Sequence, residues 1–312
     1  MAVQSLNQRI QQFYDQSTPL WLDVWGEHMH HGYYGLDGME RKEHRQAQID
    51  MVKEVLKWGN LDARYQIPDV ERSEIPSNGG TKRPITDNRY RILDVGCGVG
   101  GSSRLLAKLF NAQVVGLTLS PVQAASAEKY TQQASLQDQV TFRTQDMMTL
   151  TEADGPFDLI WSMESAEHIP DKKGLLEMFH KLLAPGGKFL ITTWCHRDTP
   201  PLSESEEKLL QHVCDLYHLP PWISIDAYEK LANETGFTNV KTDDWSRVVF
   251  PFWGAVMQSA FTWQGLKGLL RSGWGTVKGA YAMRYMQAGF RRGVIKYAVI
   301  QGQKSGAEFT EL

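Results

Sequence analysis

The chain of 312 residues contains only three cysteines, Cys97, Cys195 and Cys214, which lie far apart in the sequence. They lack the paired spacing of a zinc-binding motif or of a disulfide-rich scaffold. The sequence therefore favours a reduced compartment, and we predict no bound metal. The N-terminus also lacks a basic segment followed by an apolar run, so we predict no secretory signal peptide and no secretion.

Long apolar runs are absent as well. The longest stretch without a charged residue, 248–266, is interrupted by Pro251, two glycines and two glutamines, so we predict no transmembrane helix. Apolar residues make up 42% of the chain and charged residues 22%, which is typical of globular proteins and excludes a disordered or collagen-like chain. The length suits one large α/β unit with an additional lobe.

Acidic residues are missing from 246–304, which contains nine lysines and arginines. This segment carries a formal charge of +9, and since the whole chain has a net charge of −3, the remainder carries −12. Such asymmetry suggests contact with an anionic partner, for example lipid headgroups or nucleic acid. The alternative is a basic helix face that is simply solvated.

Hydrophobic periodicity predicts that the chain begins with helices, over 4–14 and 41–58. Residues 60–89 contain three prolines and the pair Gly79-Gly80, which predicts a long loop. Strands and helices then alternate, which predicts a parallel sheet with helices on both faces. The expected strands are 92–95, 114–119, 140–143, 157–162, 188–193 and 295–300; the expected helices are 102–110, 121–133, 173–183, 203–217, 225–235 and most of 245–287.

Residues 94–101, Asp-Val-Gly-Cys-Gly-Val-Gly-Gly, lie where the first strand of this sheet turns into a helix. Nucleotides bind at this place in α/β sheets, and glycines 96, 98 and 101 also satisfy the dinucleotide fingerprint. The glycines alone therefore do not choose between NAD(P) and S-adenosylmethionine. Asp94 does, because a carboxylate roughly 4 Å from a pyrophosphate would repel it by about 1 to 4 kcal/mol but would attract a cationic ligand.

The pattern Asp-x-Gly-x-Gly-x-Gly resembles motif I of class I methyltransferases, which implies that S-adenosylmethionine is the cofactor and S-adenosylhomocysteine the product. A dinucleotide site also expects an acidic residue about 20 positions further on, where this chain has Thr118. Residues 116–120 and Gln123 resemble the C-methyltransferase and cyclopropane-synthase branch, in which neutral side chains replace that acid. The alternative for Thr118 and Gln123 is a strand-end threonine and an exposed helical glutamine.

The resemblance implies a set of cofactor-binding residues. Thr118 and Gln123 are the candidates for the ribose, and Asp146 for the adenine amino group. The full expected set is Tyr33, Asp94, Gly96, Cys97, Gly98, Gly100, Gly101, Thr118, Leu119, Gln123, Asp146, Met147 and Met163. Tyr33 is included because it resembles the tyrosine that closes over the methionine moiety in related lipid methyltransferases; its alternative role is aromatic packing.

Several segments in order resemble γ-tocopherol C-methyltransferases. They are 25–34 (Trp-Gly-Glu-His-Met-His-His-Gly-Tyr-Tyr), 161–171, 193–197, 244–246, 251–253, 269–273 and 293–296. The resemblance covers nearly the whole chain apart from 60–89. It implies a Rossmann-like α/β fold with a mostly parallel seven-stranded sheet and a helical cap lobe. We expect a helical cap segment at 1–59, an insertion loop at 60–89, the cofactor-binding core at 90–197, and at 198–312 a substrate-binding lobe with the strands that complete the sheet.

The resemblance implies methylation of a chromanol ring carbon, which converts γ- to α-tocopherol and δ- to β-tocopherol. The family also includes plant alkaloid N-methyltransferases, so methylation of a small aromatic amine is the alternative. Two further alternatives are an adenosyl-binding module without catalysis and a nucleic-acid methyltransferase. No base-methylation motif follows the strand at 157–162, so we expect no nucleic-acid partner.

A phenol is a poor carbon nucleophile until its proton leaves, and lowering its pKa from about 10 to about 7 is worth roughly 4 kcal/mol. The sequence therefore predicts a base near the hydroxyl. The catalytic candidates are Glu164, His168 and His31, and Glu164 has the alternative role of orienting a histidine or stabilising the sulfonium. The expected substrate-binding residues are His30, Trp194, Trp222, Trp245, Phe252 and Trp253.

A tocopherol resides in membranes, so an enzyme that acts on it should contact a membrane surface, and the basic segment 246–304 is the candidate for this contact. We expect this segment to dock on an anionic bilayer without spanning it. The location expected is the cytoplasm or the plastid stroma, at the surface of a photosynthetic membrane. The sequence leaves the oligomeric state open.

Overall fold

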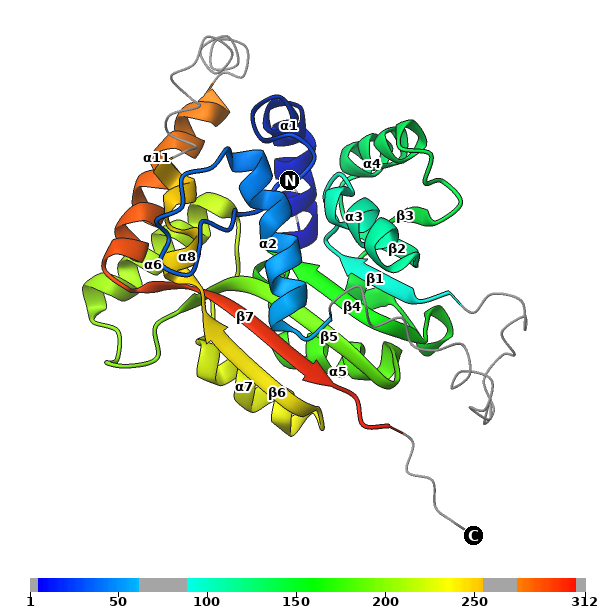
Figure 1. Ribbon diagram of the computed structural model, residues 1–312. Helices are drawn as coiled ribbons and strands as arrows, with labels where there is room; N and C mark the ends of the chain where they lie inside the picture. The colour runs from blue at the N-terminus through cyan, green and yellow to red at the C-terminus, as the bar shows by residue number, and fades with distance from the viewer. Residues whose placement is uncertain (1–4, 62–88, 255–273, 307–312) are drawn as a thin grey trace.

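The computed structural model describes residues 5–61, 89–254 and 274–306 (Figure 1). The loop predicted at 60–89 lies almost wholly outside the described residues. So does the middle of the helical region predicted at 245–287.

A seven-stranded sheet forms the centre of the molecule. Its strands are β1 (Arg91–Val95), β2 (Gln113–Thr118), β3 (Val140–Thr144), β4 (Phe157–Met163), β5 (Leu183–His196), β6 (Thr238–Asp244) and β7 (Ile295–Gln303). The spatial order is β3-β2-β1-β4-β5-β7-β6. The first five strands in this order are parallel, and β7 runs antiparallel to both β5 and β6. The order reverses between β1 and β4, so a crevice opens at their carboxyl ends.

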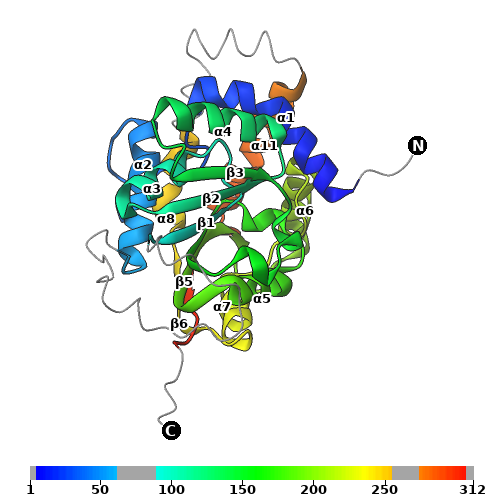
Figure 2. The same cartoon turned by 90° about the vertical axis from the view of Figure 1, so that its right-hand side faces the viewer.

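Helices cover both faces of this sheet (Figures 1 and 2). They are α1 (Leu6–Trp25), α2 (His44–Trp58), α3 (Gly101–Phe110), α4 (Pro121–Gln133), α5 (Lys172–Leu182), α6 (Glu204–Tyr217), α7 (Ile225–Glu234), α8 (Ser246–Val249) and α11 (Trp274–Arg291). Three short 3-10 turns are η1 (Met147–Thr149), η2 (Glu152–Asp154) and η3 (Ala166–His168). None of the described helices is both long and apolar enough to cross a membrane.

The core has two halves because successive strand residues face opposite sides of the sheet. In β1, Ile92 packs into a cluster with residues of α2 and α3, whereas Leu93 packs into a second cluster with residues of α5 and α7. The predicted α/β class with a mostly parallel seven-stranded sheet is confirmed.

Helix α1 and strand β6 differ most from the prediction, and β5 is longer at both ends than the strand predicted at 188–193. Helix α1 begins at a capping box made by Ser5 and Gln8 and continues through Pro19 to Trp25, well beyond the predicted end at residue 14. Strand β6 has no counterpart among the predicted strands, because this edge strand is mostly exposed and polar and so lacks the apolar signal of a core strand.

Candidate active site

The crevice between β1 and β4 contains a pocket with an empty volume of about 990 Å³, counting the part open to solvent. The loops that follow β1, β2, β3 and β4 line it. Helix α1 contributes Ile10 and Tyr14, and residues 26–31, which we call the histidine loop, contribute Glu27 to His30.

Two glycines allow the walls of this pocket to approach one another. Gly96 has a φ of +73°, and a Cβ there would lie 2.2 Å from the Cβ of Ser165. A Cβ at Gly101, the first residue of α3, would lie 2.1 Å from the carbonyl oxygen of Glu27. Any larger residue at these positions would push the β4 loop or the histidine loop away from the glycine loop.

Asp94 places a buried carboxylate beside the glycine loop, where it is only 2% exposed. Ser103 Oγ donates a hydrogen bond of 2.5 Å to its Oδ2. Burial raises the pKa of Asp94 to about 7, and Ser103 and Arg104 offset this only in part. A cationic group beside Asp94 would relieve this cost, whereas a phosphate would increase it. The residues present therefore fit the ammonium of S-adenosylmethionine.

The other end of the pocket has neutral and acidic hydrogen-bonding groups. Thr118 Oγ1 donates to Gln123 Oε1 at 2.7 Å, and both side chains are buried, so Gln123 is not an exposed helical residue. Asp146 accepts hydrogen bonds from Asn7 Nδ2 at 2.6 Å and from the backbone N–H of Met148 at 2.9 Å. These groups follow β2 and β3, where the fold directs the adenosine part of a nucleotide.

Glu164, directly after β4, lines the pocket and has a φ of +52°. Its Oε1 accepts from the backbone N–H of His31 at 2.6 Å and from Tyr297 Oη at 2.9 Å, and its Oε2 accepts from His31 Nδ1 at 2.8 Å. Burial opposes the charged form, but the charge and hydrogen bonds of His31, with help from His30, hold the pKa of Glu164 below its ordinary value. Such strain in a buried, ionised residue is typical of functional sites.

His31 lies behind Glu164, outside the pocket lining. Its Nδ1 donates to Glu164, and its buried Nε2 has no hydrogen-bond partner among the described residues. Its ring contacts an aromatic cluster, which we define as Trp194, Trp222, Phe252, Trp253 and Phe290. The ring centroid of Phe252 is 4.5 Å from that of His31.

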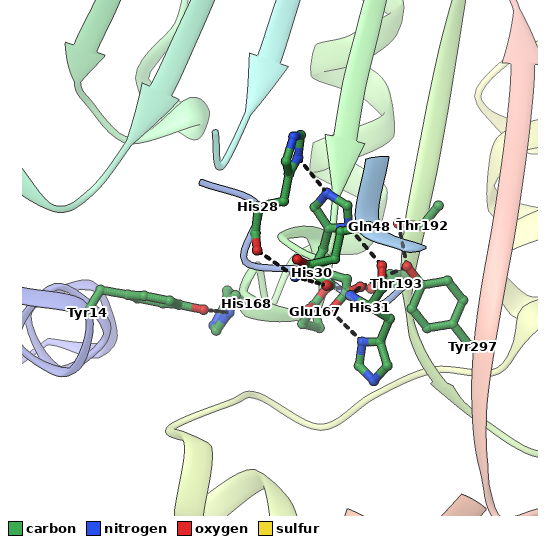
Figure 3. A network of polar contacts seen from close by, with 11 residues as sticks. Tyr14, His28, His30, His31, Gln48, Glu167, His168, Thr192, Thr193 and Tyr297 are labelled. Carbon is green, nitrogen blue, oxygen red and sulfur yellow. Dashed lines mark hydrogen bonds and ion pairs between the residues drawn. The ribbon is translucent and has the colours of Figure 1, made fainter. Parts of the chain in front are cut away.

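Burial favours the neutral form of the other two histidines of the loop, His28 and His30, which lie beside one another (Figure 3). Burial lowers the pKa of His28 to about 3 and also lowers that of His30. His30 Nδ1 donates to the carbonyl of His31 at 2.9 Å, so its Nε2 is an acceptor and lies 3.2 Å from His28 Nδ1. Gln48 of α2 donates to the carbonyls of His28 and His30, which fixes the histidine loop over the pocket.

Helix α1 covers the pocket through three polar contacts. Asn7 bonds to Asp146, Tyr14 Oη lies 2.8 Å from His168 Nε2, and Asp15 accepts from Ser120 Oγ at 2.5 Å. These partners belong to the loops after β3, β4 and β2, so the helix spans the whole crevice. Figure 2 shows α1 beside α4 along this edge of the sheet.

The structure brings most of the predicted residues together. Those that line the pocket are His30, Asp94, Gly96, Cys97, Gly98, Gly101, Thr118, Leu119, Gln123, Asp146, Met147, Met163, Glu164 and His168. Gly100 is the left-handed N-cap of α3, next to the lining residues. His31, Trp194, Trp222, Phe252 and Trp253 meet behind Glu164. Their roles stay predictions.

Two predicted residues, Tyr33 and Trp245, lie outside both the pocket lining and the aromatic cluster. Tyr33 packs on Trp245 with ring centroids 5.7 Å apart, and neither residue lines the pocket. The backbone N–H of Tyr33 donates to the carbonyl of Ala47 at 2.8 Å, which ties this segment to α2. Trp245 instead donates its indole N–H to Asp243 at 3.0 Å. The packing alternative for Tyr33 is the one that the structure favours.

Sequence reasoning missed several residues of the site. Tyr14, Ser103 and Tyr297 bond to His168, Asp94 and Glu164, respectively, yet none belongs to a recognisable motif. Arg104 is a further omission: it is buried and donates to Glu27 at 2.6 Å, which ties the histidine loop to α3. The only signal that the sequence offered for Arg104 was an arginine in the helix that follows the glycine loop. Among the described residues, no group of three or more histidine, cysteine, aspartate or glutamate side chains is arranged to hold a metal ion.

Comparison with known proteins gives concordant similarities. A family model described as a methyltransferase domain matches residues 31–242. The chain is 42% identical to "Probable tocopherol O-methyltransferase, chloroplastic" of Oryza sativa subsp. japonica, over 96% of this chain and 78% of that protein. It is 38% identical to "Tocopherol O-methyltransferase, chloroplastic" of Arabidopsis thaliana, over 97% and 84%.

A more distant relative is norajmaline N-methyltransferase of Rauvolfia serpentina, 30% identical over 96% of this chain and 98% of that one. Among solved structures, a putative sarcosine dimethylglycine methyltransferase from Galdieria sulphuraria superposes with a TM-score of 0.74 at 22% identity, covering 93% of this chain and 99% of that chain. This likeness supports the fold.

Proposed function

Because this chain belongs to the tocopherol methyltransferase family of S-adenosylmethionine-dependent enzymes, we propose that it methylates a ring carbon of γ-tocopherol to give α-tocopherol. We extend the proposal to δ-tocopherol, which would give β-tocopherol. The observation that carries the proposal is the ionised Glu164, which is held by His31 and Tyr297 between the glycine-loop pocket and the aromatic cluster.

S-adenosylmethionine, when bound, supplies a methyl group that its sulfonium already activates. Asp94 would hold the ammonium, Thr118 and Gln123 the ribose, and Asp146 the adenine amino group. The protein's own contribution is then to orient the acceptor ring and to exclude water, which accounts for the burial of the polar groups around Glu164.

Glu164 is the proton acceptor in this proposal. As the new carbon–carbon bond forms, positive charge develops on the phenol and makes its O–H strongly acidic, so a carboxylate with a low pKa can take the proton. The methylated carbon then loses its hydrogen as a proton to solvent, the oxygen recovers its proton from Glu164, and the ring regains aromaticity. One proton is thus released for each methyl group transferred. His31 and Tyr297 act as positioning residues, since their three hydrogen bonds fix the direction of the carboxylate.

The aromatic cluster is the proposed site for the apolar parts of the acceptor. Its side chains Trp194, Trp222, Phe252 and Trp253 come from separate parts of the chain and pack into one apolar core. Large, flat apolar side chains beside a few polar groups are typical of sites for ring-containing lipids.

An assay with a labelled methyl group tests the reaction. We expect labelled α-tocopherol from γ-tocopherol and no label in indole alkaloids offered at the same concentration. The position of the label matters, because the names of the relatives specify O-methylation. Methylation of the ring carbon leaves a titratable phenol in the product, whereas methylation of oxygen removes it. A methyl ether, or labelled alkaloid alone, would contradict the proposal.

Variants test the base. Glu164→Gln keeps the shape of the side chain but removes its charge, and we expect turnover to fall at least about tenfold, an apparent barrier increase of about 1.4 kcal/mol or more. We also expect Glu164→Ala and His168→Ala each to slow turnover at least about tenfold. Wild-type rates in Glu164→Gln and Glu164→Ala would remove the base assignment.

We further propose that the protein docks on an anionic membrane surface. Leu36 and Met39 are 78% and 76% exposed, and they lie in a fixed turn in which Met39 N–H bonds to Asp37. The turn rests on the start of the basic segment, since a Cβ on Gly38 would lie 2.2 Å from the carbonyl of Arg247. Exposed apolar side chains next to a basic segment match a bilayer surface with anionic headgroups.

Vesicle sedimentation tests this docking. We expect phosphatidylglycerol vesicles, but not phosphatidylcholine vesicles, to retain the protein at low salt, and the double variant Leu36→Ser, Met39→Ser to lose this binding. Val122→Ser is a matched control, because Val122 is exposed (37%) but lies on α4. Equal retention of the double variant and the control would contradict docking through the turn. The names of the two plant relatives support a photosynthetic compartment as the location of this membrane.

A further inference from the structure

Tyr14 and His168 form a hydrogen-bonded pair in the pocket wall that the proposed methylation does not yet use. Tyr14 comes from α1 and His168 from η3, and Tyr14 Oη lies 2.8 Å from His168 Nε2. Both residues line the pocket. Figure 3 shows that Tyr14 reaches His168 on the opposite side of the view from His31 and Tyr297.

The number of unpaired hydrogen-bonding groups favours one tautomer of His168. If Nε2–H donated to Tyr14, the hydroxyl hydrogen of Tyr14 and the lone pair of His168 Nδ1 would both lack a partner among the described residues. If Tyr14 O–H donates to Nε2, only the N–H at His168 Nδ1 lacks a partner. Buried polar groups are rarely left unpaired, so the arrangement with fewer unpaired groups is favoured. His168 then carries its hydrogen on Nδ1.

The Nδ1 atom of His168 is buried and has no hydrogen-bond partner among the described residues. Burial, followed by the charge of Lys172, lowers the pKa of His168 to about 3, so the ring is neutral at physiological pH. An unpaired buried donor costs about 1 to 3 kcal/mol, which a ligand with a well-placed acceptor atom would recover. His168, a residue of the pocket lining, thus carries one neutral N–H donor that has no acceptor among the described residues.

Glu164 and His168 face the same pocket from a single loop. They lie four residues apart after β4, and both line the pocket. The same acidic groups act on Tyr14, because burial and then the charges of Glu167 and Glu164 raise the pKa of Tyr14 above its ordinary value. The pocket therefore offers a hydrogen-bond acceptor, Glu164, and a hydrogen-bond donor, His168, to one bound ring.

We propose that His168 Nδ1–H donates a hydrogen bond to a second oxygen of the acceptor ring, the one para to the phenol that Glu164 contacts. Tyr14 is the positioning residue that holds His168 in the required tautomer. The inference rests on the proposed function and narrows the substrate class to aromatic rings with two para oxygens. In a chromanol this second oxygen is the ring ether, which accepts a hydrogen bond but cannot donate one.

The test compares γ-tocopherol with an analogue in which a CH2 group replaces the ring oxygen. The measured quantity is the ratio of kcat/KM for the two substrates, compared across variants so that the intrinsic reactivity of each ring cancels. We expect the ratio in the wild type to exceed the ratio in His168→Phe by about tenfold. His168→Asn, whose amide N–H can take the place of Nδ1–H, is expected to restore part of the difference.

Two further variants complete the design. Tyr14→Phe keeps His168 but removes the group that fixes its tautomer, so we expect an intermediate ratio. His180→Phe alters a histidine that does not line the pocket, and we expect it to keep the wild-type ratio. If His168→Phe does not fold, the Asn and Tyr14 variants decide.

Equal ratios in the wild type and in the His168 and Tyr14 variants would overturn the inference while leaving the methylation of tocopherols intact. A wild type that methylates neither substrate would overturn the proposed function instead.

Discussion

Replacing Asp94 by asparagine should stabilise the ligand-free protein while it weakens cofactor binding. Asp94 is 2% exposed, and burial raises its pKa to about 7 from an ordinary value of 3.8. The folded state therefore binds a proton more tightly than the unfolded state, so between these two pH values stability falls as pH rises. Above pH 7 the accumulated cost approaches about 4 kcal/mol, because each pH unit contributes about 1.36 kcal/mol.

The Asp94→Asn side chain would keep an acceptor oxygen for Ser103 Oγ but would carry no charge. We expect urea unfolding of the ligand-free variant at pH 8 to give a free energy of unfolding about 2 to 4 kcal/mol above that of the wild type. At pH 5 the gap should narrow to between about 1 and 2 kcal/mol, since most of the Asp94 carboxyl is then protonated in the folded state. The gap as a function of pH is the diagnostic measurement.

Calorimetric titration with S-adenosylhomocysteine supplies the functional half of the test. The wild type should bind more weakly as pH falls below about 7, because the cationic ammonium must then displace a proton from Asp94. The variant should bind weakly at every pH. A variant that is less stable than the wild type at pH 8, or a stability gap that does not depend on pH, would refute the reasoning about this carboxylate.

Three further substitutions probe the supports of the site. Gly101→Ala would place a Cβ 2.1 Å from the Glu27 carbonyl, so calorimetry should show at least a tenfold loss of affinity for S-adenosylhomocysteine, whereas Gly254→Ala, whose added Cβ would have no described residue within 4 Å, should change nothing. Arg104→Met removes a buried cation that binds Glu27 and two backbone carbonyls, and urea unfolding should show a loss of about 2 to 4 kcal/mol. Gln48→Leu leaves two carbonyls of the histidine loop unpaired, and the same assay should show a loss of about 1 to 3 kcal/mol.

The alternating part of the fold could be predicted from the sequence because its strands and helices carry strong, regular apolar patterns. The strand predicted at 92–95 is β1 and the helix at 121–133 is α4, with the predicted bounds or one residue more. Edge strand β6 has no such pattern, because few of its side chains are buried. The sequence did not predict the second half of α1, because a proline such as Pro19 ordinarily ends a helix.

The residues of the site also differ in whether the sequence could predict that they come together. Asp94, the glycines and Glu164 lie at or just after strand ends, and the topology alone gathers strand ends at one edge of a parallel sheet. Tyr297 is different: it stands within β7 and reaches Glu164 only because β7 pairs with β5 in one particular antiparallel register, opposite Trp194. Local sequence patterns do not specify such a register, so this contact had no signal that reading the chain could find.

The long reach of α1 has a consequence for how the protein matures on the ribosome. This helix is synthesised before the residues that it bonds to, Ser120, Asp146 and His168, which follow 105 to 154 positions later. The helix therefore has no complete docking surface until the chain has been translated as far as His168. Meanwhile its aromatic face, which includes the stacked pair Trp21 and Trp25, must wait in contact with water or a chaperone. Helix α1 thus covers the crevice late, after the strands beneath it have formed.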